Sequence, residues 1–302
     1  MELFHQDNLF TPKGGVDGYN ALRSQHNVDA INVQASNVAV AIQPLVMKDG
    51  ILLIAASVLA NGYSTPHDLS FRLTPKGDLE AAPALEYMKG KGYKKLAILS
   101  LTNEIGVSLS DSLTRAAEGS SVKIVAKESF APDATDYRTQ LAKIKAQNPD
   151  VIYLVALGSQ SAQILKQAQE LGINASYMSY RAAEDPALIK NAPDLASKIV
   201  YTSAFDEASM VPESKAFVTA WNAKYPGEAP NAYAAEAYQS ILFMAEAFDA
   251  CGKDYGCIQK KLESFKDHPS VFGPVSYDEN GDISYKFFFK TIKDGKFVKL
   301  AM

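Results

Sequence analysis

Hydrophobic residues in this chain gather in short, nearly continuous runs, separated by longer stretches in which apolar residues recur at helical spacing. Such runs are typical of strands in a parallel sheet that helices cover on both faces. The runs that predict strands are Val28 to Val33, Ile51 to Ala55, Leu96 to Leu101, Val122 to Val125, Val151 to Leu157, Ala175 to Tyr180 and Lys198 to Ser203. The pattern therefore predicts an α/β fold.

The stretches between these runs predict helices. Residues 78–91 begin with an acidic first turn and end before Gly92, and residues 159–171 carry one apolar stripe and end before Gly172. After residue 203 the pattern changes, because residues 214–225 and 231–250 predict successive helices with no strand between them.

The end of the chain predicts a β-hairpin. Residues 278–282 (Asp-Glu-Asn-Gly-Asp) are turn-forming residues between two β-prone runs, and the second of these runs covers residues 284–292. Residues 293–296 (Lys-Asp-Gly-Lys) form a similar turn before a last run at 297–300.

The order of elements predicts two Rossmann-like lobes. The α/β pattern restarts after residue 74, yet the helices after residue 203 have no sheet of their own and must return to the first lobe to bury their apolar faces. We expect an N-terminal lobe of residues 1–73 and 204–272 and a C-terminal lobe of residues 74–203 and 273–302. Three hinge segments, at 73–74, 201–204 and 272–274, would join them, with a ligand cleft between the lobes at the strand ends.

Length and composition fit this two-lobe prediction. The chain has 302 residues, of which 47% are hydrophobic and 21% charged, as in ordinary globular proteins. The formal net charge of -4 comes without a basic patch, which disfavours nucleic-acid binding. The sequence contains no run of about 18 apolar residues, the length that would predict a membrane span.

Catalytic and metal-binding motifs are absent from the sequence. There is no glycine-rich dinucleotide fingerprint, no phosphate-binding loop and no nucleophile elbow. The histidines lack metal-ligand spacing; they are His5, His26, His67 and His268. We therefore expect a protein that is not an enzyme and that uses no cofactor or metal.

The two cysteines, Cys251 and Cys257, are separated by five residues that include two glycines. They could be free thiols at a helix end, or a disulfide that closes a small loop. The pairing rule favours the disulfide, since no third cysteine competes, and a disulfide would imply an oxidising compartment.

Several segments in order resemble the type I periplasmic solute-binding proteins of the leucine/isoleucine/valine-binding kind. They are residues 29–37 (DAINVQASN), 44–54 (PLVMKDGILLI), 71–74 (FRLT), 94–98 (KKLAI), 148–153 (NPDVIY), 164–168 (ILKQA) and 272–282 (FGPVSYDENGD), together with Tyr137, Leu141 and Ile144. The resemblance covers nearly the whole chain. It implies the two-lobed fold, hinge closure around a small solute, a periplasmic or extracytoplasmic location, a monomeric state and an ABC permease as partner. A ligand-sensing receptor domain of the same fold is the alternative.

The resemblance also implies a difference at the N-terminus. Family members open with a strand and a long helix before the segment that resembles residues 1–8. Both are missing here, as is a signal peptide, so we expect a hole in the first sheet, and the chain could be an incomplete open reading frame or a fragment.

Ligand-binding positions follow from the resemblance. In the first lobe they are Ser36, Asn37, Ser57, Val58 and Leu59, and Leu59 stands where a threonine is usual. The matching positions in the second lobe are Ile105, Leu157, Gly158 and Arg181. Ser36 and Asn37 could instead cap the helix that they open.

Arg181 is the most informative of these positions, since it stands where the family has an acid that pairs with the ligand's ammonium group. An arginine repels an ammonium group and attracts a carboxylate. We therefore expect a small carboxylate without an amine, clamped by Arg181, with Ile105, Leu157 and Leu59 around its apolar part. The alternative is that Arg181 turns outward and pairs with Glu184 or Asp185.

Overall fold

The structure, a computed structural model, describes residues 1–301, which form two compact units. Unit 1 comprises Met1–Lys76 and Phe205–Lys286, and unit 2 comprises Gly77–Ala204 and Phe287–Met302. The chain passes between the units three times. The first two crossings lie within three residues of the predicted boundaries, whereas the third lies at Lys286 and not near residue 273.

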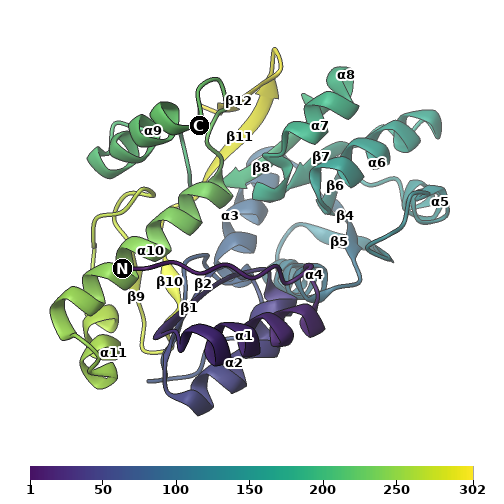
Figure 1. Cartoon of the computed structure of the whole chain (residues 1–302). Coiled ribbons are helices and arrows are strands. Elements are labelled where there is room, and N and C mark those ends of the chain that lie inside the picture. The colour runs from purple at the N-terminus through teal and green to yellow at the C-terminus, as the bar shows by residue number, and fades with distance from the viewer. Residues whose placement is uncertain (302) are drawn as a thin grey trace. The chain divides into compact units, whose positions relative to one another are not determined.

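Unit 1 contains a parallel sheet and a small two-stranded sheet (Figure 1). The parallel sheet has the order β1-β2-β3, and β9 pairs with β10 in antiparallel fashion. The elements of unit 1 are α1 (Pro12–His26), β1 (Ala30–Gln34), α2 (Ser36–Asp49), β2 (Leu52–Ser57), β3 (Ser70–Arg72), α9 (Pro212–Lys224), α10 (Ala232–Cys251), α11 (Tyr255–Glu263), β9 (Ser276–Tyr277) and β10 (Ile283–Ser284).

Helices cover both faces of the parallel sheet in unit 1. Side chains of β2 alternate between the two faces: Leu53 and Ala55 pack in the cluster formed with α1 and α2, while Leu52 and Ile54 pack with α10 and α11. Figure 1 shows α1 and α2 on one side of the sheet and α10 on the other. Burial on both faces explains why β2 reads as an uninterrupted apolar run.

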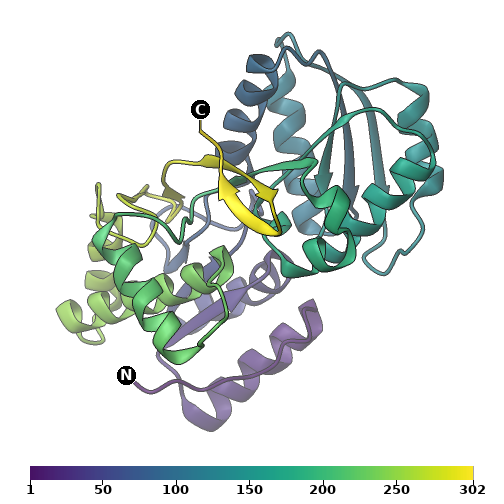
Figure 2. The same cartoon turned by 90° about the horizontal axis from the view of Figure 1, so that it is seen from above.

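The N-terminal residues 1–8 form no strand. They run back along α1, where the ring of Phe4 stacks on His26 at 3.8 Å between centroids (Figure 2). The expected hole in the sheet is not observed among residues 1–301, because β1, β2 and β3 form one continuous ladder.

Aromatic residues join α9 to α10 in unit 1. Phe217 packs against Phe205, Trp221 and Tyr238, with ring centroids 5.6, 6.0 and 5.0 Å away. Trp221 also contacts Tyr225, and its indole N–H donates to the carbonyl of Glu228 at 2.8 Å. These contacts show how the helices after residue 203 bury their apolar faces in unit 1.

Unit 2 is built on one larger sheet with the order β12-β11-β8-β7-β6-β4-β5. The five strands from β8 to β5 are parallel, and the terminal hairpin of β11 and β12 adds two antiparallel strands. The elements of unit 2 are α3 (Gly77–Gly90), β4 (Lys95–Leu101), α4 (Glu104–Ala117), β5 (Lys123–Phe130), α5 (Arg138–Ala146), β6 (Val151–Val155), α6 (Gly158–Glu170), β7 (Ser176–Ser179), the 3-10 helix η1 (Arg181–Ala183), α7 (Pro186–Asn191), α8 (Pro193–Ala196), β8 (Ile199–Ser203), β11 (Phe288–Lys293) and β12 (Lys296–Lys299).

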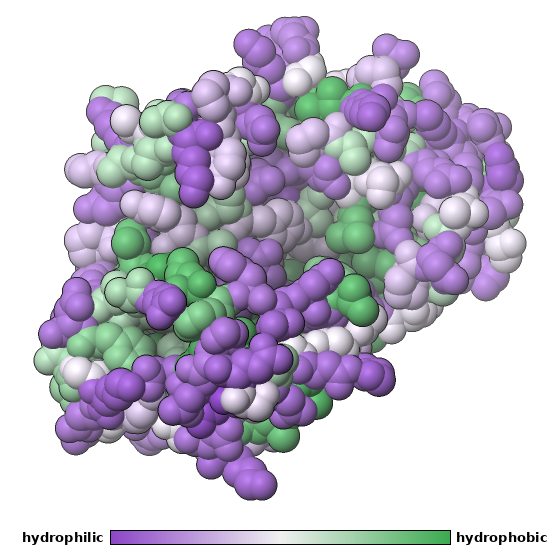
Figure 3. Space-filling view, viewed as in Figure 1, coloured by the Kyte–Doolittle hydropathy of each residue, from purple (hydrophilic) through white to green (hydrophobic). Residues whose placement is uncertain are grey.

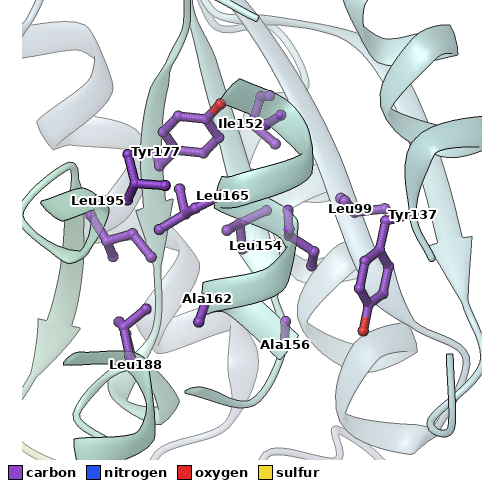
Figure 4. Packing of buried hydrophobic residues seen from close by; sticks show 14 of the residues in the cluster. Leu99, Tyr137, Ile152, Leu154, Ala156, Ala162, Leu165, Tyr177, Leu188 and Leu195 are labelled. Carbon is purple, nitrogen blue, oxygen red and sulfur yellow. The ribbon is translucent and has the colours of Figure 1, made fainter. Parts of the chain in front are cut away.

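The main core of unit 2 lies between its sheet and the helices α5 to α8. Figure 4 shows Ala162 and Leu165 of α6 packed over Ile152 and Leu154 of β6, beside Tyr177 of β7. Helices α3 and α4 pack together on the opposite face (Figure 1). Surface residues are mostly hydrophilic in the view of Figure 3, with hydrophobic ones in small patches.

The C-terminal tail departs from the prediction. The sequence pattern places residues 273–286 in the second lobe, but they belong to unit 1, where Tyr277 and Ile283 pack in the core with Phe71 and where Asp282 pairs with Arg72. The single strand predicted over 284–292 is therefore divided, since β10 ends at Ser284 and β11 begins at Phe288.

Candidate functional site

The predicted ligand residues of unit 1 lie after the carboxyl ends of the adjacent strands β1 and β2. Ser36 is the first residue of α2 and is fully buried, and its Oγ accepts the backbone N–H of Leu59 at 3.1 Å. Asn37 is half-buried and donates from Nδ2 to the carbonyl of Phe10 at 2.9 Å. Neither side chain caps α2, whose N-cap residue is Ala35 at φ 82° with no side-chain cap bond.

The second segment of this edge is Ser57, Val58 and Leu59. Ser57 ends β2 and is 7% exposed, and the two residues that follow are almost fully buried. The bond between Ser36 and Leu59 ties this segment to the start of α2. The structure thus brings Ser36 next to Leu59, and the bond from Asn37 to Phe10 ties the N-terminal segment to α2.

A buried acid that the prediction missed lies on α10. Glu236 is 1% exposed, and its Oε1 accepts the hydroxyl of Thr74 at 3.0 Å. The same hydroxyl lies 3.0 Å from the carbonyl of Ala56, at the end of β2. An acid among the apolar residues that open α10 was the available sequence signal.

The predicted residues of unit 2 lie after the carboxyl ends of β4, β6 and β7, which are neighbours in the sheet. Ile105 is half-buried in the first turn of α4, and Leu157 is 39% exposed at the N-cap of α6. Gly158 approaches Asp185 so closely that a Cβ at this position would lie 2.4 Å from the Asp185 Cβ. The edge therefore needs a glycine at this position.

Arg181 opens η1 and is separated from the end of β7 by Tyr180 alone, and only 6% of it is exposed. Its Nη1 lies 3.9 Å from Oε2 of Glu80, a fully buried acid on α3. The outward turn considered as an alternative for Arg181 does not fit this burial. Asp185 caps α7 by accepting the N–H of Ala187 at 2.8 Å.

Burial raises the pKa of the Glu80 carboxyl, and the Arg181 charge and the Thr202 hydroxyl partly offset this rise. Thr202 lies on β8 and donates to Oε1 of Glu80. Glu80 was missed in the sequence because an acid near a helix start is ordinarily a solvated first-turn residue.

A second buried ion pair of unit 2 joins Glu184, which follows η1, to Lys290. Glu184 accepts from Nζ of Lys290 on β11 and, at 3.1 Å, from the hydroxyl of Ser203. Burial, together with the Glu184 charge, raises the pKa of Tyr201 above its ordinary value. The sequence analysis considered Glu184 only as a partner of Arg181, and it did not predict a role for Lys290.

Other features of the structure do not involve the predicted ligand residues. Cys251 and Cys257 form a disulfide with Cα atoms 5.6 Å apart. Residues 1–301 contain no group of three or more His, Cys, Asp or Glu side chains able to hold a metal ion. A surface pocket of unit 1, lined among others by Val218, Asn222 and Pro230, includes none of the predicted ligand residues.

Comparison with known proteins identifies the family. Residues 1–296 match the family model described as periplasmic binding protein. The chain belongs to the periplasmic binding protein family. Members of this family bind solutes and are not enzymes, so the prediction of a non-enzymatic binding protein is confirmed. No helix within residues 1–301 of this periplasmic binding protein is long and apolar enough to cross a membrane.

Individual relatives agree with this assignment. The Leu/Ile/Val-binding protein BraC3 of Rhizobium johnstonii is 24% identical over 288 residues, which are 93% of this chain and 77% of BraC3. The crystal structure of the leucine-binding protein LivK of Thermotoga maritima has a TM-score of 0.91 at 21% identity, covering 99% of this chain and 87% of LivK.

A further similar structure is that of LivJ of Streptococcus pneumoniae, a branched-chain amino acid transporter substrate-binding protein in complex with isoleucine. It has a TM-score of 0.87 at 25% identity, and the match covers 99% of this chain and 87% of LivJ. The predicted type I periplasmic binding protein fold is thereby confirmed.

Proposed function

We propose that this protein is the extracytoplasmic solute-binding component of an ABC importer, and that it binds a small carboxylate-bearing or amino-acid-like solute. The curated relatives include Leu/Ile/Val-binding proteins, and the similar LivJ structure belongs to a branched-chain amino acid transporter. These names favour transport over the alternative of a sensing receptor. The partner would be a membrane permease, and we expect the protein to act as a monomer.

The observation that carries the proposal is the position of the candidate residues in each sheet. In unit 1 they follow β1 and β2, and in unit 2 they follow β4, β6 and β7. The carboxyl ends of parallel strands are the usual ligand-binding edge of open α/β sheets. Each unit would contribute part of the solute contacts, and closure of the units about the three crossings would exclude water from the bound solute.

The disulfide supports an extracytoplasmic location. A bond between Cys251 and Cys257 forms and persists in oxidising compartments and is rare in the cytosol. This location can be tested in a producing strain by separating periplasmic from cytosolic proteins and labelling the free thiols of this protein in each fraction.

The solute contact that we propose for unit 2 is Arg181. Its guanidinium can hold a carboxylate through two parallel hydrogen bonds. Glu80 lies beside it and compensates part of its charge, so the expected preference for a carboxylate is moderate. Ile105 and Leu157, at the ends of the adjacent strands β4 and β6, would contact the apolar part of the solute.

A thermal-shift screen followed by calorimetry tests the solute class. The panel pairs amine-free carboxylates (4-methylpentanoate, phenylacetate) with leucine and isoleucine, since a solute at about 100 times its Kd stabilises the folded state by about 2.7 kcal/mol. We expect the carboxylates to raise the melting temperature and Arg181→Gln to weaken their binding by about tenfold or more.

Arg138→Gln is the matched control, because Arg138 is half-exposed in the same unit and pairs with Glu170 on the surface. It should leave every Kd unchanged. Stabilisation by leucine or isoleucine alone would show that the role given to Arg181 is wrong while solute binding stands. No stabilisation by any member of the panel would rule out the proposed solute class.

A further inference from the structure

Two acids and two bases lie buried near the carboxyl end of β8 in unit 2. We call Glu80, Arg181, Glu184 and Lys290 the buried charge cluster. None of the four is more than 6% exposed, and they come from α3, η1 with its C-cap, and β11. The cluster holds as many acidic as basic side chains.

Two hydroxyl groups of β8 fasten the acids of the cluster. Thr202 donates to Glu80, and the next residue, Ser203, lies 3.1 Å from Glu184 through its Oγ. Successive side chains of a strand point to opposite faces, so the two acids are held from the two faces of the same strand end. Arg181 is the first residue of η1, and Glu184 is its C-cap residue.

Because Glu80 and Arg181 are both buried, the charge of Glu80 interacts strongly with that of Arg181. A buried ion whose partner is removed destabilises a protein far more than an exposed one, because no water replaces the lost partner. Glu80 is fully buried, and its Oε2 lies 3.9 Å from the Arg181 guanidinium. Arg181 is the residue that we place against the solute, whereas Glu80 would act through Arg181.

We propose that Glu80 is the positioning residue of Arg181, and that its charge sets how strongly Arg181 prefers a carboxylate over an uncharged amide in the solute. This proposal rests on the proposed function, because it requires a solute at Arg181. With Glu80 ionised, part of the Arg181 charge is compensated, and a carboxylate is preferred over an amide only moderately. Without that charge, more of the positive charge of Arg181 acts on the solute.

The first experiment measures the pair without any ligand. Unfolding in urea is followed for Glu80→Gln, Arg181→Gln and the double variant, all in the full chain. We expect the double variant to lose less stability than the two single variants do in sum, and the difference should be about tenfold or more in the unfolding equilibrium constant. The exposed pair Arg138 and Glu170, treated with the same substitutions, should couple by less than about twofold.

The second experiment measures specificity by calorimetry with two probes of one carbon skeleton, 4-methylpentanoate and 4-methylpentanamide. Glutamine keeps the shape of Glu80 and can still accept from Thr202, so Glu80→Gln removes mainly the charge. We expect the ratio of the amide Kd to the carboxylate Kd to rise by about tenfold in Glu80→Gln. A residue with only a structural role would weaken both probes equally.

The outcomes separate the two proposals. Additive changes at Glu80 and Arg181 would overturn the pairing, and an unchanged Kd ratio in Glu80→Gln would overturn the specificity role. If neither probe nor leucine binds the wild-type protein, the proposed solute class fails and the specificity role with it, while the urea cycle still decides the pairing.

Discussion

Replacing Asp282 by Asn should destabilise unit 1 strongly, because Asp282 compensates a completely buried arginine. Oδ1 of Asp282 lies 2.7 Å from Nε of Arg72, whose side chain is 0% exposed, and Lys76 reaches Oδ2 at 3.3 Å. Burial lowers the pKa of Arg72, and the charge of Asp282 opposes that effect. Asparagine keeps the shape of the side chain but removes the negative charge.

The magnitude follows from this geometry. Removing one partner of a buried ion pair costs about 3–5 kcal/mol, compared with about 0–1 kcal/mol for an exposed pair. For a unit of about 160 residues, 1 kcal/mol shifts the melting temperature by about 2–4 °C. We therefore expect Asp282→Asn to lower the melting temperature of unit 1 by about 10 °C.

Circular dichroism melts at pH 7 provide the assay; because this signal sums both units, the temperature compared is that of the transition that Asp282→Asn displaces. Asp17→Asn is the matched control. Asp17 pairs with Lys13 on the surface of the same unit, with 61% of its side chain exposed, so its loss should move the melting temperature by no more than about 1 °C. A double change, Arg72→Met with Asp282→Asn, should recover much of the loss, since no charge is then buried alone. Equal melting temperatures for Asp282→Asn and Asp17→Asn would refute this account of the pair.

Three further predictions concern single positions. Gly158→Ala should destabilise unit 2 by about 1–3 kcal/mol in urea unfolding, because its Cβ would lie 2.4 Å from the Asp185 Cβ. Removing the disulfide by changing Cys251 and Cys257 to Ala should cost about 2 kcal/mol, and a reductant should then leave the melting curve of the variant unchanged. Asp150 accepts the N–H groups that precede and open β4, and these bonds hold its pKa below the ordinary range, so Asp150→Asn should lower stability by about 1 kcal/mol at pH 7 and by less near pH 3.

Each of these predictions has a control or a contradicting result. Gly90 lies at the end of α3, and a Cβ added there would meet no atom within 4 Å, so Gly90→Ala should be neutral or stabilising. A reductant that leaves the wild-type melting curve unchanged would contradict the disulfide estimate. The Asp150 carboxylate stabilises the fold above its ordinary pKa and loses this effect as the pH falls, so an equal effect of Asp150→Asn at pH 3 and pH 7 would be incompatible with the reasoning.

The apolar runs predicted the central strands well because helices bury both faces of those strands. Strands that lack a long apolar run were missed or shortened. Lys123–Phe130 forms β5 at the edge of its sheet, and most of its positions are partly or fully exposed, so the apolar run covered only its start. Ser70–Arg72 forms β3, where Arg72 is buried by an ion pair that no local pattern reveals.

The candidate site was predictable only as positions along the chain. Resemblance placed Ser36, Leu59 and Arg181 at strand ends, and the structure puts them there. Their partners come from distant segments: Glu80 reaches Arg181 from α3, and Lys290 reaches Glu184 from the last hairpin. A sequence read locally gives such acids and bases their commonest role, that of solvated surface residues, because their burial depends on tertiary packing.

Trp221 is the single tryptophan of the chain, and it lies in unit 1 between Phe217 and Tyr225. Its emission is consequently a natural optical reporter of one unit, set by the rings around it and by its bond to the Glu228 carbonyl. Fluorescence follows the melting of α9 against α10, whereas far-ultraviolet dichroism averages over both sheets. A difference between the two curves would therefore measure, without any label, how independently the two units unfold.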